Sequence, residues 1–289
     1  MSNADPFDHS VRAMTDDGAF RVITVRTTQT VKGILEAQSA TGTAARVFGD
    51  LLTATVLFRE TMSPNLRVQG ILRDRDGLGT LVADSAPEGH TRGLCQPAKK
   101  GSPQSGAPHS NTLLQMMRTL ASGHVNQGVV KMEDPTDVTR GMMAYMKESE
   151  QVDTMLAVGT QFNDAGEVCA AGGYMVQLLP EVGRGPLAIM AERLEDFRSI
   201  DHLLDAQFSP EHLRDELLYG MPFTALDQSP VSFSCWCSEN RLLGALATLD
   251  SNEIQSMIDE GQPIEINCDY CLRQYAISPA RLHGLLRQN

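Results

Sequence analysis

The sequence predicts a mixed α/β or α+β N-terminal domain over residues 1–180, a helical linker over 181–231, and a small C-terminal α+β domain over 232–289. Three observations lead to this division. Strand-like and helix-like apolar patterns alternate in the first part, two helical segments follow it, and paired cysteines mark the last part. A chain of 289 residues is long enough for one large domain or two ordinary ones with an ample hydrophobic core.

Apolar, β-branched runs alternate with segments of helical spacing in the N-terminal part. The turn Asn163-Asp-Ala-Gly166 joins two strands, and this hairpin is expected to close the domain near Pro180. The stretch 96–112, QPAKKGSPQSGAPHSNT, lacks periodic apolar residues and indicates a mobile surface loop within the domain. Strands are expected at 20–27, 66–74, 79–85, 127–134, 153–162 and 167–180, and helices at 30–40, 43–62 and about 137–150.

The linker carries an apolar stripe that must cover another surface. Its second helix has Ser209 as N-cap and Pro210 at the first helical position, and it ends at Gly220 and Pro222. In the resting protein these helices are expected to pack on the first domain as ordinary surface helices, which does not exclude a later release. The stripe of the first helix comprises Leu187, Met190, Leu194, Phe197, Ile200 and Leu204.

Four cysteines stand in two close pairs, Cys235-Trp-Cys237 and, after thirty further residues, Cys268-Asp-Tyr-Cys271. Zinc prefers four tetrahedral ligands, and two tight cysteine pairs from separated segments supply them. The sequence therefore predicts one Zn²⁺ held by four thiolates. Each pair is also close enough in sequence to form its own disulfide, so the site is a possible redox switch.

The predicted C-terminal domain is too short to build a large core. Helices are expected at 238–249 and 250–261, and strands flank the second cysteine pair. A core of this size supplies only about 3–5 kcal/mol, whereas structural zinc contributes on the order of 10–16 kcal/mol in peptide systems. Metal should therefore decide whether this domain folds. Oxidation that removes the ligands should expel zinc, unfold the domain and expose the apolar stripe of any linker helices that lean on it.

Charge and hydropathy exclude several classes of function. The net charge of −12 opposes binding to nucleic acid, and residues 232–289 alone carry four Arg and no Lys against seven acidic residues. There is no signal-peptide pattern and no apolar run long enough to span a membrane. The chain is thus expected to be soluble and cytoplasmic, where clustered cysteines bind metal or sense redox state rather than form permanent disulfides.

The sequence gives little support to an enzyme, because dinucleotide, Walker and nucleophile-elbow motifs are all missing. A thiol oxidoreductase built on Cys268 and Cys271 is an alternative, although it leaves the other pair unexplained and an adjacent Asp opposes thiolate formation. A structural-zinc adaptor that binds a fixed partner is another. Cys95 and Cys169 are expected to be small buried hydrophobes, and His283 a surface residue rather than a fifth ligand.

The cysteine segments resemble one known family. FSCWCSENRLLGALATL followed by IEINCDYCLRQYAIS is similar to the redox-switch domain of the heat-shock protein 33 family of oxidation-activated holdase chaperones. Three further segments resemble parts of that family's N-terminal domain and occur in the same order: FGDLLTATVLF, LRVQGILRDRDGLGTLVADSAPEGHTRG and AAGGYMVQLLP. The loop at 96–112 has no assignable counterpart.

The resemblance implies a functional cycle. The reduced form holds zinc through Cys235, Cys237, Cys268 and Cys271 and is inactive. Oxidation forms Cys235–Cys237 and Cys268–Cys271 disulfides, releases the zinc, and lets a metastable linker expose a surface for unfolded client proteins. The active form is expected to be a homodimer.

Overall fold

The computed structural model describes residues 7–74, 77–98, 112–120, 122–179, 185–205 and 207–286. The chain divides into two compact units, residues 1–234 and residues 235–289. The mixed α and β composition expected from the sequence is confirmed. The expected domain end near Pro180 and most of the 96–112 loop lie outside the described residues.

The first unit contains an antiparallel five-stranded sheet, sheet A, with strand order β10-β1-β2-β9-β8. Strand β10 lies inside the range expected to be a helical linker, because pairing with β1 satisfies its backbone groups. The predicted hairpin joins β8 and β9 at Asn163. The strands are β1 (His9–Thr15), β2 (Phe20–Arg26), β8 (Thr154–Phe162), β9 (Val168–Leu178) and β10 (Phe223–Pro230).

The second sheet of this unit, sheet B, has the order β11-β5-β4-β3-β6-β7. Its strands pair antiparallel, except that β11 runs parallel to β5. The strands are β3 (Arg67–Asp74), β4 (Gly79–Ser85), β5 (His90–Gln96), β6 (Leu113–Thr119), β7 (Val125–Lys131) and β11 (Ser232–Phe233), and a short 3₁₀ turn η1 (Pro87–Gly89) precedes β5.

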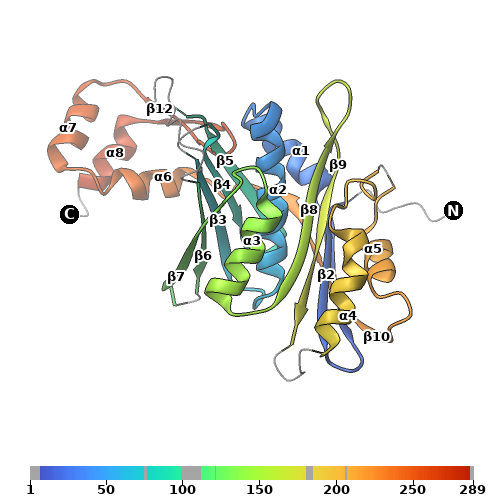
Figure 1. Ribbon diagram of the computed structural model, residues 1–289. Helices are drawn as coiled ribbons and strands as arrows, with labels where there is room; N and C mark the ends of the chain where they lie inside the picture. Colours follow the sequence, from blue (N-terminus) through green and yellow to red (C-terminus); the bar gives the residue numbers. More distant parts are fainter. Residues whose placement is uncertain are drawn as a thin grey trace. The chain divides into compact units, whose positions relative to one another are not determined.

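Helix α2 (Gly42–Glu60) lies between the two sheets (Figure 1). It contacts β2, β8 and β9 of sheet A and β3, β4 and β5 of sheet B. Close approach to sheet B requires glycine at position 93, since a Cβ there would lie 2.5 Å from the Phe48 ring. From Leu51 to Glu60 every residue of the helix is buried, so both sheets cover it. Helices α1 (Thr28–Ala37) and α3 (Val138–Tyr145), with its π-helical extension η2 (Met146–Glu150), pack beside it.

The outer face of sheet A is covered by α4 (Gly185–Arg193), η3 (Leu194–Phe197) and α5 (Pro210–Leu217) (Figure 1). The Ser209 hydroxyl caps α5 by accepting from the backbone N–H of His212. Phe208 packs over Gly172, where a Cβ would lie 2.4 Å from its ring. The buried apolar residues of this covering segment are Met190, Leu194, Ile200, Leu204, Phe208, Leu213, Leu217 and Leu218.

One carboxyl group in the first unit is placed unfavourably for a charge. Asp50 of α2 accepts a hydrogen bond of 2.8 Å from the Thr160 hydroxyl of β8. Burial raises the pKa of Asp50 to about 7 despite that bond, and the charges of Asp201 and Asp137 raise it further. Asp50 therefore titrates near neutral pH in the native protein.

The native pKa of Asp50 lies above the ordinary value of 3.8, so the unfolded chain loses this proton first. The free energy of unfolding should fall as pH rises from about 4 to about 7. We expect D50N, which can still accept from Thr160, to stabilise the protein at pH 8 by up to about 4 kcal/mol. Urea unfolding at pH 5 and pH 8 measures this, with D164N in the β8–β9 turn as the control for losing one carboxylate. An equal gain at both pH values would contradict the assignment.

Candidate metal centre

The second unit has little core of its own. It comprises α6 (Glu239–Leu246), α7 (Ser251–Asp259), β12 (Ile264–Asn267), β13 (Gln274–Ile277) and α8 (Pro279–Leu286). Asp250 and Glu253 form a capping box at the start of α7, where the sequence predicts a helix to begin. Among the described residues, the apolar side chains fully buried here are Ile254, Ile258, Ile277 and Leu282. Packing alone therefore contributes little to the stability of this unit.

The two cysteine pairs lie on two separate loops of this unit. Cys235 and Cys237 precede α6, and Cys268 and Cys271 occupy the turn between β12 and β13. That turn is closed by hydrogen bonds from the Cys268 N–H to the Arg273 carbonyl (2.9 Å) and from the Leu272 N–H to the Cys268 carbonyl. Leu272 adopts a positive φ of 58°, a conformation that non-glycine residues take up only in such tight turns.

The structure brings the four predicted ligands together. Their Sγ atoms all lie within 4.8 Å of one another, with 3.7 Å between Cys235 and Cys268 and 3.5 Å between Cys237 and Cys271. Four sulfurs at the usual Zn–S length form a tetrahedron with edges of about 3.8 Å. All six cysteines are free thiols, so the four sulfurs can act as thiolate donors. The site thus has the donor set and spacing of a closed tetrahedral zinc centre.

The thiols of the cluster differ in acidity. Burial acts to raise the pKa of Cys237, but hydrogen bonds from Tyr275 and the neighbouring cysteines outweigh it and lower the pKa to about 7. The Tyr275 hydroxyl donates to the Cys237 sulfur at 3.1 Å. Burial raises the pKa of Cys268, and burial with a hydrogen bond to Cys237 raises that of Cys271 to about 12. Cys237 therefore ionises well before Cys268 and Cys271, and a bound cation would have to displace the remaining protons.

The other residues singled out from the sequence lie elsewhere. Cys95 on β5 is half-buried, and burial raises its pKa. Cys169 is exposed, so its expected burial is wrong: it sits near the start of β9, beside the register irregularity at Gln161 and Phe162 of β8, and the core lies on the other side of the strand. His283 is exposed on α8. Within the described ranges, the four-cysteine group is the one cluster with metal-binding geometry.

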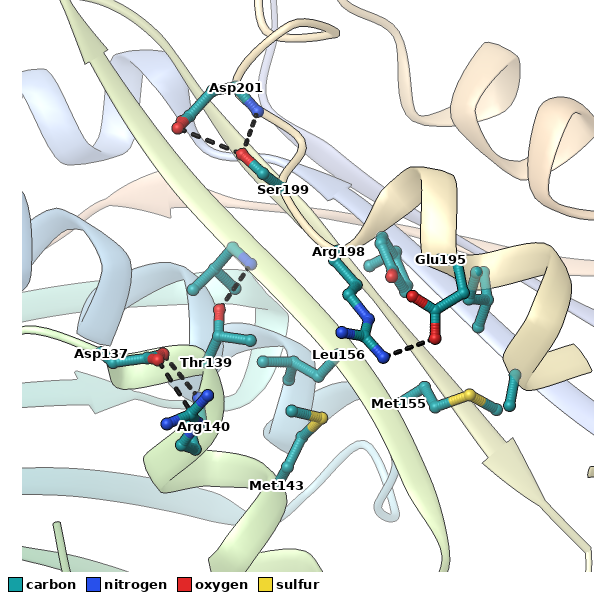
Figure 2. A pocket seen from close by; sticks show the side chains of 14 residues that line it. Asp137, Thr139, Arg140, Met143, Met155, Leu156, Glu195, Arg198, Ser199 and Asp201 are labelled. Carbon is teal, nitrogen blue, oxygen red and sulfur yellow. Dashed lines mark hydrogen bonds and ion pairs between the residues drawn. The ribbon is translucent and has the colours of Figure 1, made fainter. Parts of the chain in front are cut away.

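The first unit contains a cavity of about 530 Å³ (Figure 2). Three segments that lie far apart in the sequence form it, so no local sequence pattern indicates it. Its walls come from α3, β8 and the α4–η3 segment, and Met143, Met155 and Leu156 line it with apolar atoms. The arginines at its rim are already paired, Arg140 with Asp137 at 3.7 Å and Arg198 with Glu195. The cavity therefore marks a loosely filled seam between the covering segment and sheet A rather than a site with an unsatisfied charge.

The hydrogen bond from Tyr275 to Cys237 can be tested without metal. We expect Y275F to raise the Cys237 pKa above about 7, because a thiolate that loses a donor is less stable. The pH dependence of iodoacetamide labelling in reduced, zinc-free protein, resolved by mass spectrometry, measures this. Y219F, which alters an exposed tyrosine of the first unit, is the control. An unchanged labelling profile in Y275F would refute the role of this hydroxyl.

None of the helices that the structure describes is long and apolar enough to cross a membrane.

A family model, curated relatives and a solved structure each match this chain over almost its whole length. The family model described as Hsp33 protein matches residues 8–278. The 33 kDa chaperonin of Symbiobacterium thermophilum is 30% identical, with 94% of this chain and 95% of the relative covered, and that of Syntrophotalea carbinolica is 28% identical, with 96% and 99% covered. The crystal structure of the 33 kDa chaperonin from Thermotoga maritima has the same fold, with a TM-score of 0.79 at 20% identity over 97% of this chain and 98% of that one. The resemblance inferred from the cysteine segments is therefore confirmed, and the chain belongs to the Hsp33 family.

Proposed function

We propose that this protein is a cytoplasmic, redox-regulated holdase chaperone, inactive when reduced and zinc-bound and active towards unfolded proteins after oxidation. The observation that carries the proposal is the cluster of four sulfurs within 4.8 Å, which joins two loops of a unit with little core. Family membership and the chaperonin names of the relatives support the chaperone activity. Zinc would be held by Cys235, Cys237, Cys268 and Cys271 and would act as a cross-link between the loops.

Oxidation would remove this cross-link. In each pair, two zinc-bound thiolates would lose two electrons to one peroxide molecule, which would take two protons from solvent; one S–S bond would form, the O–O bond and two Zn–S bonds would break, and two waters would result. Two peroxides thus convert the four ligands into two disulfides, and the metal leaves as Zn²⁺. A bridge within Cys235–Cys237 or Cys268–Cys271 closes a very short loop and restrains the unfolded chain far less than a link between distant segments. The second unit should therefore unfold.

Unfolding of the second unit would act on the segment that covers sheet A. The chain runs from α5 through β10 and β11 to the metal ligands, and Ser234 alone separates β11 from Cys235. Strand β11 is short: it pairs with β5 at two positions, Ser232 with His90 and Phe233 with Thr91, and the Ser234 N–H donates to the Thr91 carbonyl. The covering segment buries eight apolar side chains, and each such side chain contributes about 1.5–3 kcal/mol when buried. Its release would expose this surface and its counterpart on sheet A to unfolded clients, and it is expected to accompany homodimer formation.

The two alternative functions that the sequence leaves open, a thiol oxidoreductase and a structural-zinc adaptor, receive less support. A thiol oxidoreductase needs an acidic attacking thiol, whereas the pKa of Cys271 is raised to about 12 and Cys268 is buried. The acidic thiol, Cys237, belongs to the other pair and is held by Tyr275. A structural-zinc adaptor would bind its partner with zinc present and with the covering segment in place. We therefore regard the chain as a non-enzymatic chaperone.

The switch predicts a linked set of changes on oxidation. Hydrogen peroxide should release one zinc per chain, form disulfides within each cysteine pair and lower the helical signal in circular dichroism. Only the oxidised protein should then suppress light scattering by a thermally unfolding client. Zinc release is followed with a chromogenic chelator, disulfides by peptide mapping, and mass by sedimentation.

Each outcome of this experiment has a clear meaning. A variant with all four cysteines replaced by serine separates loss of zinc from disulfide formation. Equal suppression by reduced and oxidised protein would reduce the cysteines to structural ligands. No suppression by either form would favour the adaptor. Disulfides between the pairs, such as Cys235–Cys268, would contradict the proposed unfolding step.

The covering segment can also be loosened without oxidation. Because Phe208 fills the space above Gly172, we expect F208A to destabilise this packing by about 3–5 kcal/mol. The reduced, zinc-loaded variant should then suppress client aggregation partially and be cut sooner by protease between residues 185 and 217. F48A, a similar truncation in the core around α2, is the matched control. Activation by F48A as strong as that by F208A would show that general destabilisation, rather than release of the segment, is responsible.

A further inference from the structure

Strand β7 forms one edge of sheet B, and among the strands that the structure describes β6 is its sole neighbour (Figure 1). It spans seven residues, Val125–Lys131, and contains no proline. Its inner side is fixed, because Val130 is buried and a Cβ on Gly128 would lie 2.8 Å from the Tyr145 ring. The strand is therefore held firmly in the sheet while its other edge remains open.

The hydrogen-bond register shows which backbone groups face outwards. The Leu120 N–H donates to His124, and the Met132 N–H donates to Thr112, on either side of the paired stretch. Hydrogen-bonded pairs alternate along an antiparallel ladder, so residues 126, 128 and 130 of β7 point their backbone groups at β6. The N–H and C=O groups of Val125, Gln127, Val129 and Lys131 point away from it. Across the described part of the chain, no hydrogen bond to these outward groups is found.

The side chains of the same residues form an exposed row on the outer face of sheet B. Val125 is 41% exposed and Val129 50% exposed. In register with Lys131 lie Leu113 on β6, itself 40% exposed, and Arg73 on β3. Along one face the edge thus offers two apolar residues, Val125 and Val129, the amide of Gln127 and the cation of Lys131.

The other long sheet edges are protected. The amide of Val158 in the edge strand β8 donates to the Thr139 hydroxyl of α3 at 3.3 Å. The edge strand β10 carries Asp227 and ends in Pro230, and charged residues and proline oppose the addition of a further strand. Strand β11 has only two residues. Strand β7 carries one charged residue, Lys131 at its C-terminal end, but residues 125–130 contain neither a charge nor a proline, which is unusual for an edge strand rich in β-branched residues.

We propose that β7 is a docking edge on which an extended segment of an unfolded protein adds as a seventh strand of sheet B. The identification of this added strand as a segment of an unfolded protein rests on the proposed holdase function. Main-chain hydrogen bonds to the four outward residues would supply affinity with little demand on sequence. Segments with an apolar residue beside Val129 and an acidic residue beside Lys131 fit the edge best.

Charge favours such a segment over a second copy of this chain. The outer face of sheet B carries Arg67, Arg73, Arg92 and Lys131 against one carboxylate, Asp84. Arg67 and Arg92 both contact Asp84, while Arg73 and Lys131 have no acidic partner among the described residues. Two copies joined along β7 would extend two faces of the same positive sign into one sheet. An acidic and apolar segment would instead complement this face.

The test uses fluorescence anisotropy with a peptide that repeats Val-Thr-Glu-Thr, so that Val and Glu fall on the same face of a strand. Because β7 is open in the reduced structure, reduced and oxidised full-length protein should both bind this single short peptide, whereas suppression of client aggregation also requires the surface that the covering segment exposes on oxidation. V129P removes one outward N–H without breaking the ladder to β6, and we expect it to weaken binding about tenfold. V129A, which keeps that N–H, should weaken binding much less. Hydrogen exchange should slow at residues 127 and 129 when the peptide binds.

Three controls make the result specific. A225P places proline at an outward-facing position of β10, by the same ladder argument, and should leave binding unchanged. The same peptide N-methylated at alternate amides should not bind. K131E should weaken binding of the Glu peptide and strengthen that of a Lys-for-Glu peptide, a readout that remains if V129P folds poorly.

Unchanged binding in both V129P and K131E, or no exchange protection in β7, would overturn the proposal. Concentration-dependent dimerisation that V129P abolishes would do so as well, because it would make the occupant a second copy. These measurements are made on the reduced protein, so they are separate from the client assay on the oxidised protein. Failure of that assay alone would remove the holdase function and leave the docking edge in place.

Discussion

The burial of α2 between two sheets is the constraint on which the first unit depends. Apolar residues on opposite sides of this helix must be covered, and sheets A and B each supply one face. Gly93 on sheet B is part of this arrangement, since it lets the Phe48 ring approach the backbone. The inner faces of both sheets pack on this helix, so each sheet is left with an outer face. A segment of the chain covers the outer face of sheet A, whereas the outer face of sheet B is exposed to solvent, and the proposed function follows from this difference.

The outer face of sheet A is apolar and is covered by residues 185–218 of the same chain. The cover is held by side-chain packing, by the cap at Ser209 and by a hydrogen bond from Tyr174 to the Phe197 carbonyl. A noncovalent cover of this kind can detach locally without loss of the main core. The outer face of sheet B is instead mixed, because Asp84 is buried between Arg67 and Arg92. It can therefore stay exposed to water and leave β7 as an open edge.

A metal ion held by the four cysteines would place a large stabilising contribution on a few atoms. The second unit has so little core that such a link between its two cysteine loops would outweigh its packing. Thiolates are readily oxidised, and Tyr275 makes one of the four thiols acidic. In the proposed switch, stability and redox sensitivity would therefore reside in one site. Such coupling would let a small chemical change act on a much larger apolar surface.

Local signals in the sequence were sufficient to predict many of the helices, strands and turns. The apolar length of α2, the capping box at Asp250, the turn at Asn163 and the two cysteine pairs each depend on residues within a few positions of one another. Other features depend on partners far along the chain. Residues 223–230 become a strand because β1 offers an open edge, Cys169 is exposed because its side of β9 faces away from the core, and the four sulfurs meet because two loops fold together. The sequence by itself therefore indicated the family, many of the helices and strands and the candidate ligand types, whereas only the tertiary structure decided which faces are buried, which edge stays open and how the four sulfurs are spaced.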